Sequence, residues 1–294
     1  MAKPNRAGRI ERKFRELRAR NEAALIPFIV AGDPDLESTA ALIRELEARG
    51  ADLIELAMPF SDPMADGPAN QRAHARGLIG GASLTAILAL VAELRKPSEL
   101  GKPGELGKAT EVPLILFGYF NPILHYGCER LCADAARAGI DGLLIVDLPP
   151  EESAELAHPA RAAGLDLIYL LAPTTPIERS RKIARVASGF LYYVSVTGVT
   201  GARADLASDL EGRVRELRAV TDLPIGVGFG ISTPEHAHAV ASFADAVVVG
   251  SALSTVIEKH GKSPDLIAAA GNFVGAMKDA IRSARGPASI AAAP

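Results

Sequence analysis

Short apolar runs alternate with longer amphipathic stretches along most of the chain. Eight of the runs are short and largely apolar, as is typical of parallel strands covered on both faces. They are residues 25–31, 52–58, 113–118, 142–147, 167–171, 190–195, 224–229 and 246–250. Amphipathic segments that predict helices lie at 10–20, 36–49, 84–95, 129–138, 151–163, 177–187, 209–220, 234–242 and 264–282. Eight strand–helix units in succession predict an α/β fold, a closed (β/α)8 TIM barrel, with a doubly wound open sheet as the alternative.

Capping residues between these segments agree with the predicted order. Three hydroxyl residues stand where helix N-caps are expected: Ser83, Thr175 and Thr233. Proline follows two of them at the expected first helical position, as Pro176 and Pro234. A glycine closes three of the helices shortly before the next strand, at positions 50, 139 and 164. At these glycines we expect the left-handed conformation that ends a helix.

Length and composition fit one large domain. The chain has 294 residues, of which 48% are hydrophobic, so we expect a single barrel domain over residues 1–285. Residues 286–294 are rich in Ala and Pro and predict a disordered tail. An insertion at 96–111 carries a tandem Glu-Leu-Gly-Lys and is expected on the N-terminal face of the barrel, away from the chemistry.

Charge and targeting signals narrow the class of partner. The net charge of −3 provides no basic face for nucleic acid or an anionic membrane, so we expect a small molecule or another protein. No apolar run approaches the roughly 20 residues of a membrane span, and the charged N-terminus lacks the apolar region of a secretory signal. We expect a cytoplasmic protein in which Cys128 and Cys132 are buried thiols. No HExxH motif or Cys/His cluster occurs, so we expect no metal.

Glu55, in the second predicted strand, is the first candidate for chemistry. Side chains alternate along a strand, so Leu53, Glu55 and Ala57 share one face, and the residues between them suit packing against helices. This alternation turns Glu55 into the barrel. No predicted strand carries a Lys or Arg in its body to pair with it. Burial should therefore raise the pKa of this carboxyl toward the range useful for proton transfer at neutral pH.

Glycine-rich segments follow the last three predicted strands. In the sixth strand, either Tyr192 or Tyr193 must face the barrel. The long Gly/Thr-rich loop that follows suits a mobile lid, although a plain surface loop fits equally well. Glycines at 226, 228 and 230, and Gly250 followed by Ser251, predict a phosphate site at a helix N-terminus. Their spacing does not match GxGxxG, which excludes a Rossmann dinucleotide site.

Six motifs then occur in order and at fitting intervals. They are Pro27 to Pro34, Glu55 to Pro68, Asp147 to Glu152, Gly198 to Gly201, Gly228 to Ser232, and Gly250 to Ala252. Together they resemble the tryptophan synthase alpha chain family over roughly residues 9–282. The run Pro-Phe-Ser-Asp-Pro followed by Ala-Asp-Gly-Pro carries most of this resemblance. Ala57 departs from it, since many relatives have Gly there.

The resemblance implies a lyase that cleaves indole-3-glycerol phosphate by a retro-aldol reaction into indole and glyceraldehyde 3-phosphate. Glu55 would be the general acid/base, Asp66 would hold the indole N–H, and Tyr192 would be the active-site tyrosine. Without the resemblance, Asp62 and Asp66 are better explained as turn residues. The implied substrate-binding residues are Phe28, Phe117 and Val146 in the indole pocket, Gly201, Phe229, Gly230, Gly250 and Ser251 around the phosphate beside a short extra helix, and Thr200 in a closing loop.

The resemblance also implies a partner. Loops that would face a beta chain carry Pro59, Asp62, Asn121 and Pro122. That chain would bring pyridoxal phosphate and receive the indole for L-tryptophan synthesis in a complex of two alpha and two beta chains, while the alpha chain itself would hold no cofactor. Two alternatives remain open: a stand-alone indole-3-glycerol-phosphate lyase and a non-catalytic activating barrel subunit.

Overall fold

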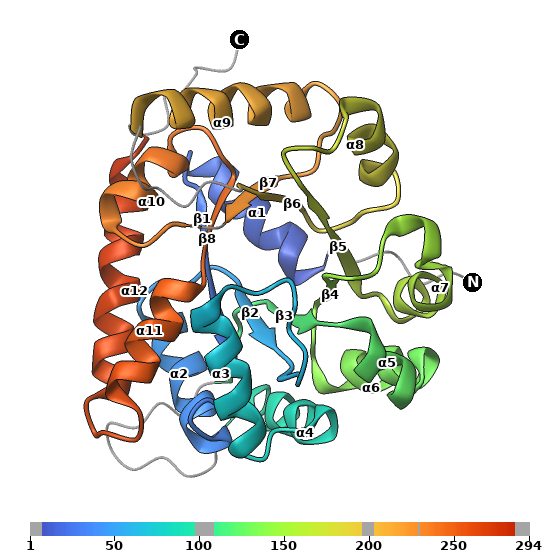
Figure 1. Ribbon diagram of the computed structural model, residues 1–294, viewed down its shortest axis with the longest axis vertical. Helices are drawn as coiled ribbons and strands as arrows, with labels where there is room; N and C mark the ends of the chain where they lie inside the picture. The colour runs from blue at the N-terminus through green and yellow to red at the C-terminus, as the bar shows by residue number, and fades with distance from the viewer. Residues whose placement is uncertain (1–7, 98–108, 196–202, 229, 286–294) are drawn as a thin grey trace.

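The structure is a computed structural model that describes residues 8–97, 109–195, 203–228 and 230–285. Its strands close into one parallel barrel in chain order, because β8 pairs with β1 (Figure 1). The strands are β1 (Ala24–Val30), β2 (Ile54–Ala57), β3 (Leu114–Gly118), β4 (Gly142–Ile145), β5 (Asp166–Leu171), β6 (Leu191–Val194), β7 (Ile225–Gly228) and β8 (Ala246–Val249). All eight predicted strands and the closed barrel are confirmed, and the open-sheet alternative is wrong.

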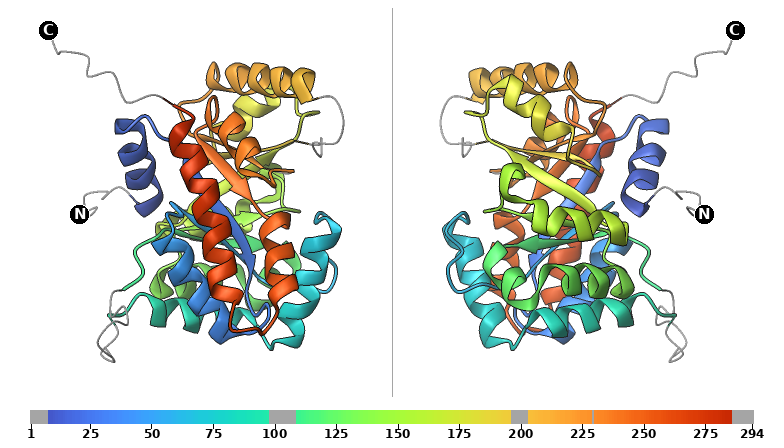
Figure 2. Two further views of the ribbon diagram at one scale, coloured as in Figure 1. Left: turned by 90° about the vertical axis from the view of Figure 1, so that its left-hand side faces the viewer. Right: turned by 90° about the vertical axis from the view of Figure 1, so that its right-hand side faces the viewer.

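Helices surround the barrel and cover one of its ends. They are α1 (Arg9–Ala19), α2 (Leu36–Ala48), α3 (Pro68–Ile79), α4 (Leu84–Leu94), α5 (Phe120–Tyr126), α6 (Cys128–Ala138), the 3-10 turn η1 (Pro150–Glu152), α7 (Ala154–Ala163), α8 (Ile177–Ala184), α9 (Arg203–Arg218), α10 (Pro234–Ala241), α11 (Ser251–His260) and α12 (Leu266–Ser283). Figure 2 shows the extra helix α1 at the end of the barrel opposite α3. The sequence pattern missed α3 and α5, whereas α11 is the short helix expected at the phosphate site.

The predicted helix ends are mostly confirmed. The side chains of Ser83 and Thr233 cap α4 and α10 by accepting from the backbone N–H three residues on. The glycines at 50, 139 and 164 have φ of 97°, 97° and 75°, so they take the expected left-handed conformation. The predictions of Thr175 as an N-cap and of Pro176 as the first helical residue are wrong, because Pro176 is itself the N-cap of α8, which begins at Ile177. Thr175 Oγ1 instead accepts from the N–H of Ala172 and closes the turn before the helix.

Two apolar clusters divide the core along the strand faces. Ile54, Leu56 and Met58 belong to the outer cluster between sheet and helices, whereas Leu53 and Ala57 belong to the cluster inside the barrel. The predicted orientation of β2 is thus confirmed, and Glu55 points inward with its neighbours on that face. Phe14 of α1 joins the inner cluster and packs on Phe190 at 5.7 Å between ring centroids, which closes the N-terminal end.

The N-terminal face is held by buried ion pairs. Arg95 donates to Asp141 and to the carbonyls of Gly139, Thr110 and Val112.

Residues 98–108 of the insertion and the tail 286–294 lie outside the described residues. Cys128 and Cys132 are free and buried, as predicted. In the described part of the chain no single helix is long and apolar enough to cross a membrane, although the sharply bent pair α3 and α4 passes that test by length and composition.

Candidate active site

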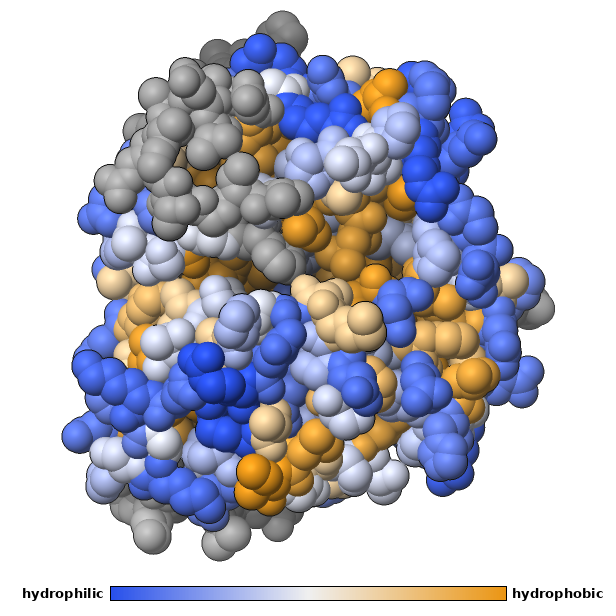
Figure 3. Space-filling view, viewed as in Figure 1, coloured by the Kyte–Doolittle hydropathy of each residue, from blue (hydrophilic) through white to orange (hydrophobic). Residues whose placement is uncertain are grey.

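Two adjoining cavities open at the C-terminal ends of the strands. The smaller, about 90 Å³, lies against β1, β2 and β8 and is lined by Phe28, Glu55, Asp66, Gly67, Asn70, Phe117, Tyr192, Gly230, Ile231, Val248, Gly250 and Ser251. The larger, about 480 Å³, extends along β4 and β5 and is mostly apolar. Figure 3 shows apolar side chains in the hollow to the right of the centre of this face, below α8. Asp66, Phe117 and Tyr192 line both cavities and form the wall between them.

Glu55 is a buried carboxyl with no countercharge among the described residues. It is 1% exposed, and its neighbours in the sheet are Phe28 of β1 and Ile115 of β3. Its Oε1 has no hydrogen-bond partner among the described residues. Burial, reinforced by the negative charge of Asp66, raises the pKa of Glu55 to about 8. The group therefore carries a proton at neutral pH and can donate it.

Asp66 stands at the entrance of the smaller cavity, in the turn before α3. The hydroxyl of Tyr119 donates to its Oδ2 at 2.7 Å and accepts from the N–H of Ala65 at 3.0 Å. Tyr119 is itself fixed by stacking on Phe60, with 5.0 Å between ring centroids. Burial and the carboxylate of Asp66 raise the pKa of Tyr119, so this hydroxyl stays a donor. The carboxylate is thus held in place by the residue that directly follows β3.

Two residues of α3 approach the same carboxylate. Asn70 Nδ2 donates to Asp66 Oδ1 at 3.3 Å, and the Nε2 atom of the fully buried His74 lies 3.4 Å from Asp66 Oδ2. His74 Nδ1 accepts from the N–H of Phe60 at 3.1 Å, so its ring proton lies on Nε2 and faces Asp66. Asp66, Asn70 and His74 are spaced four residues apart, which brings them to one side of the helix start.

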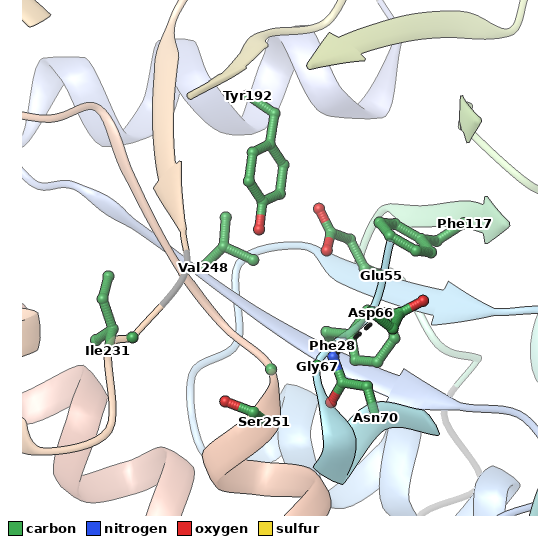
Figure 4. A pocket seen from close by; sticks show the side chains of 12 residues that line it. Phe28, Glu55, Asp66, Gly67, Asn70, Phe117, Tyr192, Ile231, Val248 and Ser251 are labelled. Carbon is green, nitrogen blue, oxygen red and sulfur yellow. Dashed lines mark hydrogen bonds between the residues drawn. The ribbon is translucent and has the colours of Figure 1, made fainter. Parts of the chain in front are cut away.

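Tyr192 completes the polar part of the site from β6. It belongs to the cluster inside the barrel, whereas Tyr193 faces the helices. A Cβ at position 228 would overlap the Tyr192 hydroxyl, so glycine there makes room for it. Burial first, then the charges of Glu55 and Asp66, raise the pKa of Tyr192 well above its ordinary value, so it remains a hydrogen-bond donor. In Figure 4 the Tyr192 hydroxyl and the Glu55 carboxyl both point into the cavity.

The opposite wall of the smaller cavity presents a helix start. Gly250 precedes α11, whose first residue is Ser251, and both line the cavity together with Gly230. The first backbone N–H groups of a helix lack intrahelical partners and its dipole favours an anion. The absence of a side chain at Gly250 keeps this helix start open to a ligand. This wall can therefore bind a phosphate group.

The predicted site residues fall into three groups. The smaller cavity brings together Glu55, Asp66, Tyr192, Phe28, Phe117, Gly230, Gly250 and Ser251, while Val146 lines the larger one. Thr200, Gly201 and Phe229 lie outside the described residues. Pro59 and the exposed Asp62 are in the loop after β2, while the exposed Asn121 and the half-buried Pro122 are in α5. The Phe60–Tyr119 stack joins that loop to the start of α5.

Tyr119, Asn70 and His74 were missed by the sequence reasoning. A signal existed for two of them, because Asn70 and His74 follow Asp66 at helical spacing. No local signal existed for Tyr119, whose contact with Asp66 joins residues 53 positions apart. In the described part of the chain, no group of three or more His, Cys, Asp or Glu side chains could hold a metal ion.

Replacing Tyr119 with Phe tests the support of Asp66. The variant loses the donor to Asp66 Oδ2, and since a hydrogen bond to a charged group is worth about 1.5–3 kcal/mol, we expect kcat/KM to fall about tenfold or more. Steady-state kinetics with the substrate that the family resemblance implies measure this. Tyr126→Phe is the matched control, because Tyr126 donates to Asp134 on the surface and its loss should change kcat/KM less than about twofold. Equal rates for the two variants would contradict the prediction.

Fold and site together define a class of protein. An inward carboxyl that is protonated at neutral pH, a fixed carboxylate and an anion-binding helix start meet at the C-terminal face of a (β/α)8 barrel. Such an arrangement is that of a barrel enzyme that performs acid/base chemistry on a phosphorylated small molecule.

Comparison with known proteins identifies the family. The model of the family described as tryptophan synthase alpha chain matches residues 14–282. The tryptophan synthase alpha chain of Geobacter sp. (strain M21) is 53% identical over 273 residues, which cover 93% of this chain and 97% of that protein. The tryptophan synthase alpha chain of Gluconacetobacter diazotrophicus is 48% identical and covers 94% and 99%.

Solved structures of tryptophan synthase alpha chains resemble this chain over nearly their whole length. Tryptophan synthase subunit alpha from Legionella pneumophila str. Paris has a TM-score of 0.83 at 39% identity and covers 95% of this chain and 100% of that chain. A chain of Mycobacterium tuberculosis tryptophan synthase has a TM-score of 0.81 at 33% identity and covers 94% and 99%. The chain belongs to the tryptophan synthase alpha chain family. Membership gives it the alpha-subunit function, a lyase half-reaction of tryptophan synthesis, and implies a beta-chain partner.

Proposed function

We propose that this chain cleaves indole-3-glycerol phosphate with Glu55, Asp66 and Tyr192 as its catalytic groups. The observation that carries the assignment is Glu55, a buried carboxyl that is unpaired among the described residues and whose pKa is raised to about 8. It lies between an apolar cavity suited to an indole ring and a helix start suited to a phosphate. A substrate with an aromatic end and an anionic end matches this division.

The proposed reaction needs one proton donor that can also accept. Glu55 gives its proton to C3 of the indole ring, which forms the protonated indolenine (3H-indolium) with the ring N–H retained. It then takes the proton of the adjacent side-chain hydroxyl while the bond between C3 and the side chain breaks and its electron pair restores the aromatic ring. The products are indole and glyceraldehyde 3-phosphate, and Glu55 ends protonated as it began. A carboxyl with a pKa near 8 suits both steps at neutral pH.

Asp66 and Tyr192 stabilise the charge that this reaction develops. The ring nitrogen becomes positive when C3 is protonated, so a carboxylate that accepts its N–H favours the transition state more than the ground state. Asp66 is placed for that role by Tyr119, at the boundary of the two cavities. Tyr192 supplies a neutral hydroxyl beside Glu55 and can donate to the side-chain oxygens of the substrate.

The residues proposed to bind the substrate divide in the same way, into an aromatic end and an anionic end. Phe28 and Phe117 meet edge to face at 5.0 Å between ring centroids, and Val146 lines the larger cavity, so these three form the indole wall. The phosphate is taken by Gly250 and Ser251 at the start of α11, together with Gly230 in the loop after β7. Gly201 and Phe229 are assigned to the phosphate site and Thr200 to a closing loop on the family resemblance alone.

The beta-chain partner is proposed to dock on the loops at this face. Pro59, Asp62, Asn121 and Pro122 lie on two elements that Phe60 and Tyr119 hold together, so a partner on them would also touch the support of Asp66. The proposed complex has two alpha and two beta chains, with pyridoxal phosphate in the beta chain. The buried free thiols of Cys128 and Cys132 support the cytoplasm as the location.

Indole release from indole-3-glycerol phosphate tests the function. We expect slow release by the purified chain and an increase of about tenfold or more when a beta chain is added, because loops at the entrance then favour the closed state. Fast release that a beta chain does not change would identify a stand-alone lyase. If no indole is released under either condition while the chain still raises the activity of the beta chain, the protein is a non-catalytic activating barrel.

A further inference from the structure

Asn70 joins the two ends of the smaller cavity. It lies on the first turn of α3, is half-buried and lines the cavity. Its Nδ2 donates to Asp66 Oδ1 at 3.3 Å, and its Oδ1 accepts from the Ser254 hydroxyl at 2.9 Å. Figure 4 shows Asn70 beside Asp66, with Ser251 across from it. One side chain thus connects the carboxylate at the aromatic end with the helix at the anionic end.

The two oxygens of Asp66 are held differently. Oδ2 accepts from Tyr119 at 2.7 Å and also faces His74 Nε2 at 3.4 Å. Oδ1 has the amide of Asn70 as its hydrogen-bond donor among the described residues. Each carboxylate oxygen can accept two hydrogen bonds, so Oδ1 keeps capacity for a donor that enters the cavity.

Ser254 anchors the amide of Asn70 at its oxygen. Ser254 is 1% exposed and lies on the first turn of α11, where its N–H donates to the carbonyl of Gly250. The carboxylate of Asp66 can only accept, so the nitrogen of Asn70 faces it, and the Ser254 hydroxyl donates to the oxygen at the other end of the amide. The amide is therefore held between Asp66 and the helix whose start forms the phosphate wall.

We propose that Asn70 is a positioning residue that aims Asp66 Oδ1 at the indole N–H and is itself anchored to α11 through Ser254. The inference rests on the proposed role of Asp66 and deepens it. Gln71 already anchors the backbone of this turn, because its Nε2 donates to the Asp66 carbonyl at 2.9 Å. The bond from Asn70 instead reaches the carboxylate of Asp66, so it acts on the orientation of the Asp66 side chain.

The experiment measures dissociation constants of two probes that cannot be cleaved. The first is 3-(indol-3-yl)propyl phosphate, which carries both the ring N–H and the phosphate; the second is glycerol 3-phosphate, which has no ring. In Asn70→Leu, which keeps the volume but makes neither hydrogen bond, the first probe should bind about tenfold more weakly. The second should change less than about twofold. Asn70→Ala, which introduces no bulk, is measured alongside and should behave in the same way.

A double-mutant cycle separates positioning from a structural role. If Asn70 acts through the carboxylate, Asn70→Leu should not weaken the indole probe further once Asp66 is replaced with Asn. Ser254→Ala should weaken the indole probe about threefold, since the amide can still donate to Asp66 but loses the bond that anchors its oxygen to α11. Arg72→Met is the matched control, because Arg72 also joins α3 to α11 but does so at the surface, through Glu258; it should leave the affinity of both probes within about twofold.

Three results would overturn the inference. They are an equal loss of affinity for both probes in Asn70→Leu, a tenfold loss that persists in the Asp66→Asn background, and a loss in Arg72→Met as large as in Asn70→Leu. A different result would refute the proposed function itself: Asp66→Asn binding the indole probe as tightly as the unmodified chain. In that case Asp66 does not hold the ring, and Asn70 cannot position it for that role.

Discussion

Replacing Glu55 with Gln is expected to lower the kcat of indole release about thousandfold. Glutamine has the same shape and keeps a polar side chain inside the barrel, but it can neither give a proton to the ring nor take one from the hydroxyl. General acid/base catalysis contributes about 10²- to 10⁴-fold to a rate, so the middle of that range is the expected loss. KM should change only a few-fold, because the indole and phosphate contacts of the substrate remain. Steady-state kinetics with and without a beta chain measure both quantities.

The matched control is Asp166→Asn. Asp166 is the first residue of β5, at the N-terminal end of that strand, and burial raises the pKa of its carboxyl as well. Its replacement should leave kcat within about twofold, because no proposed site residue contacts it. A Glu55→Gln variant that released indole at the rate of the unmodified chain would show that the proton comes from another group.

The pH dependence of the unmodified chain should report the same group. Because Glu55 must be protonated before it can act on the ring, kcat/KM should fall as pH rises above about 8, where the carboxyl loses its proton. The residual activity of Glu55→Gln should lack this decline. A fall that persists in the variant at the same pH would assign it to a different residue.

The position of Glu55 was predictable because a strand has a simple period. Alternation along β2 fixes which side chains face inward, and the apolar strands beside it leave no cation to neutralise a carboxyl. Asp66 was different. Its local sequence is that of an ordinary turn, and only the family resemblance assigned it a role in chemistry. What sets it apart, the contact with Tyr119, depends on how β2 and β3 pair in space.

The helices that were missed have physical reasons as well. The buried residues of α3 are Ala73, His74 and Gly77, so its inner face carries no run of large apolar side chains at helical spacing. This face is small because it packs closely on the loop after β1, where a Cβ at Gly77 would overlap the carbonyl of Ala31. The other missed helix, α5, has seven residues and includes Pro122. Periodicity finds elements that bury much apolar area, and the segments that hold Asp66 in place bury little.

The protonation of Glu55 also makes the stability of the chain depend on pH. Its pKa is raised from 4.5 to about 8 by folding, so above pH 4.5 the folded chain binds more protons at this group than the unfolded chain. The free energy of unfolding must then decrease as pH rises from about 5 to 8. One pKa unit corresponds to about 1.4 kcal/mol, so the loss over this interval is expected to be about 3–4 kcal/mol.

The Glu55→Gln variant isolates this contribution. Glutamine does not titrate, so the difference in unfolding free energy between the variant and the unmodified chain should grow in favour of the variant by about 3–4 kcal/mol between pH 5 and pH 8. Urea unfolding at several pH values measures the difference, which removes the effects of every other titrating group common to both chains. A difference that stays constant with pH would mean that Glu55 is ionised in the folded chain, and the first proton transfer to the ring would then need another donor.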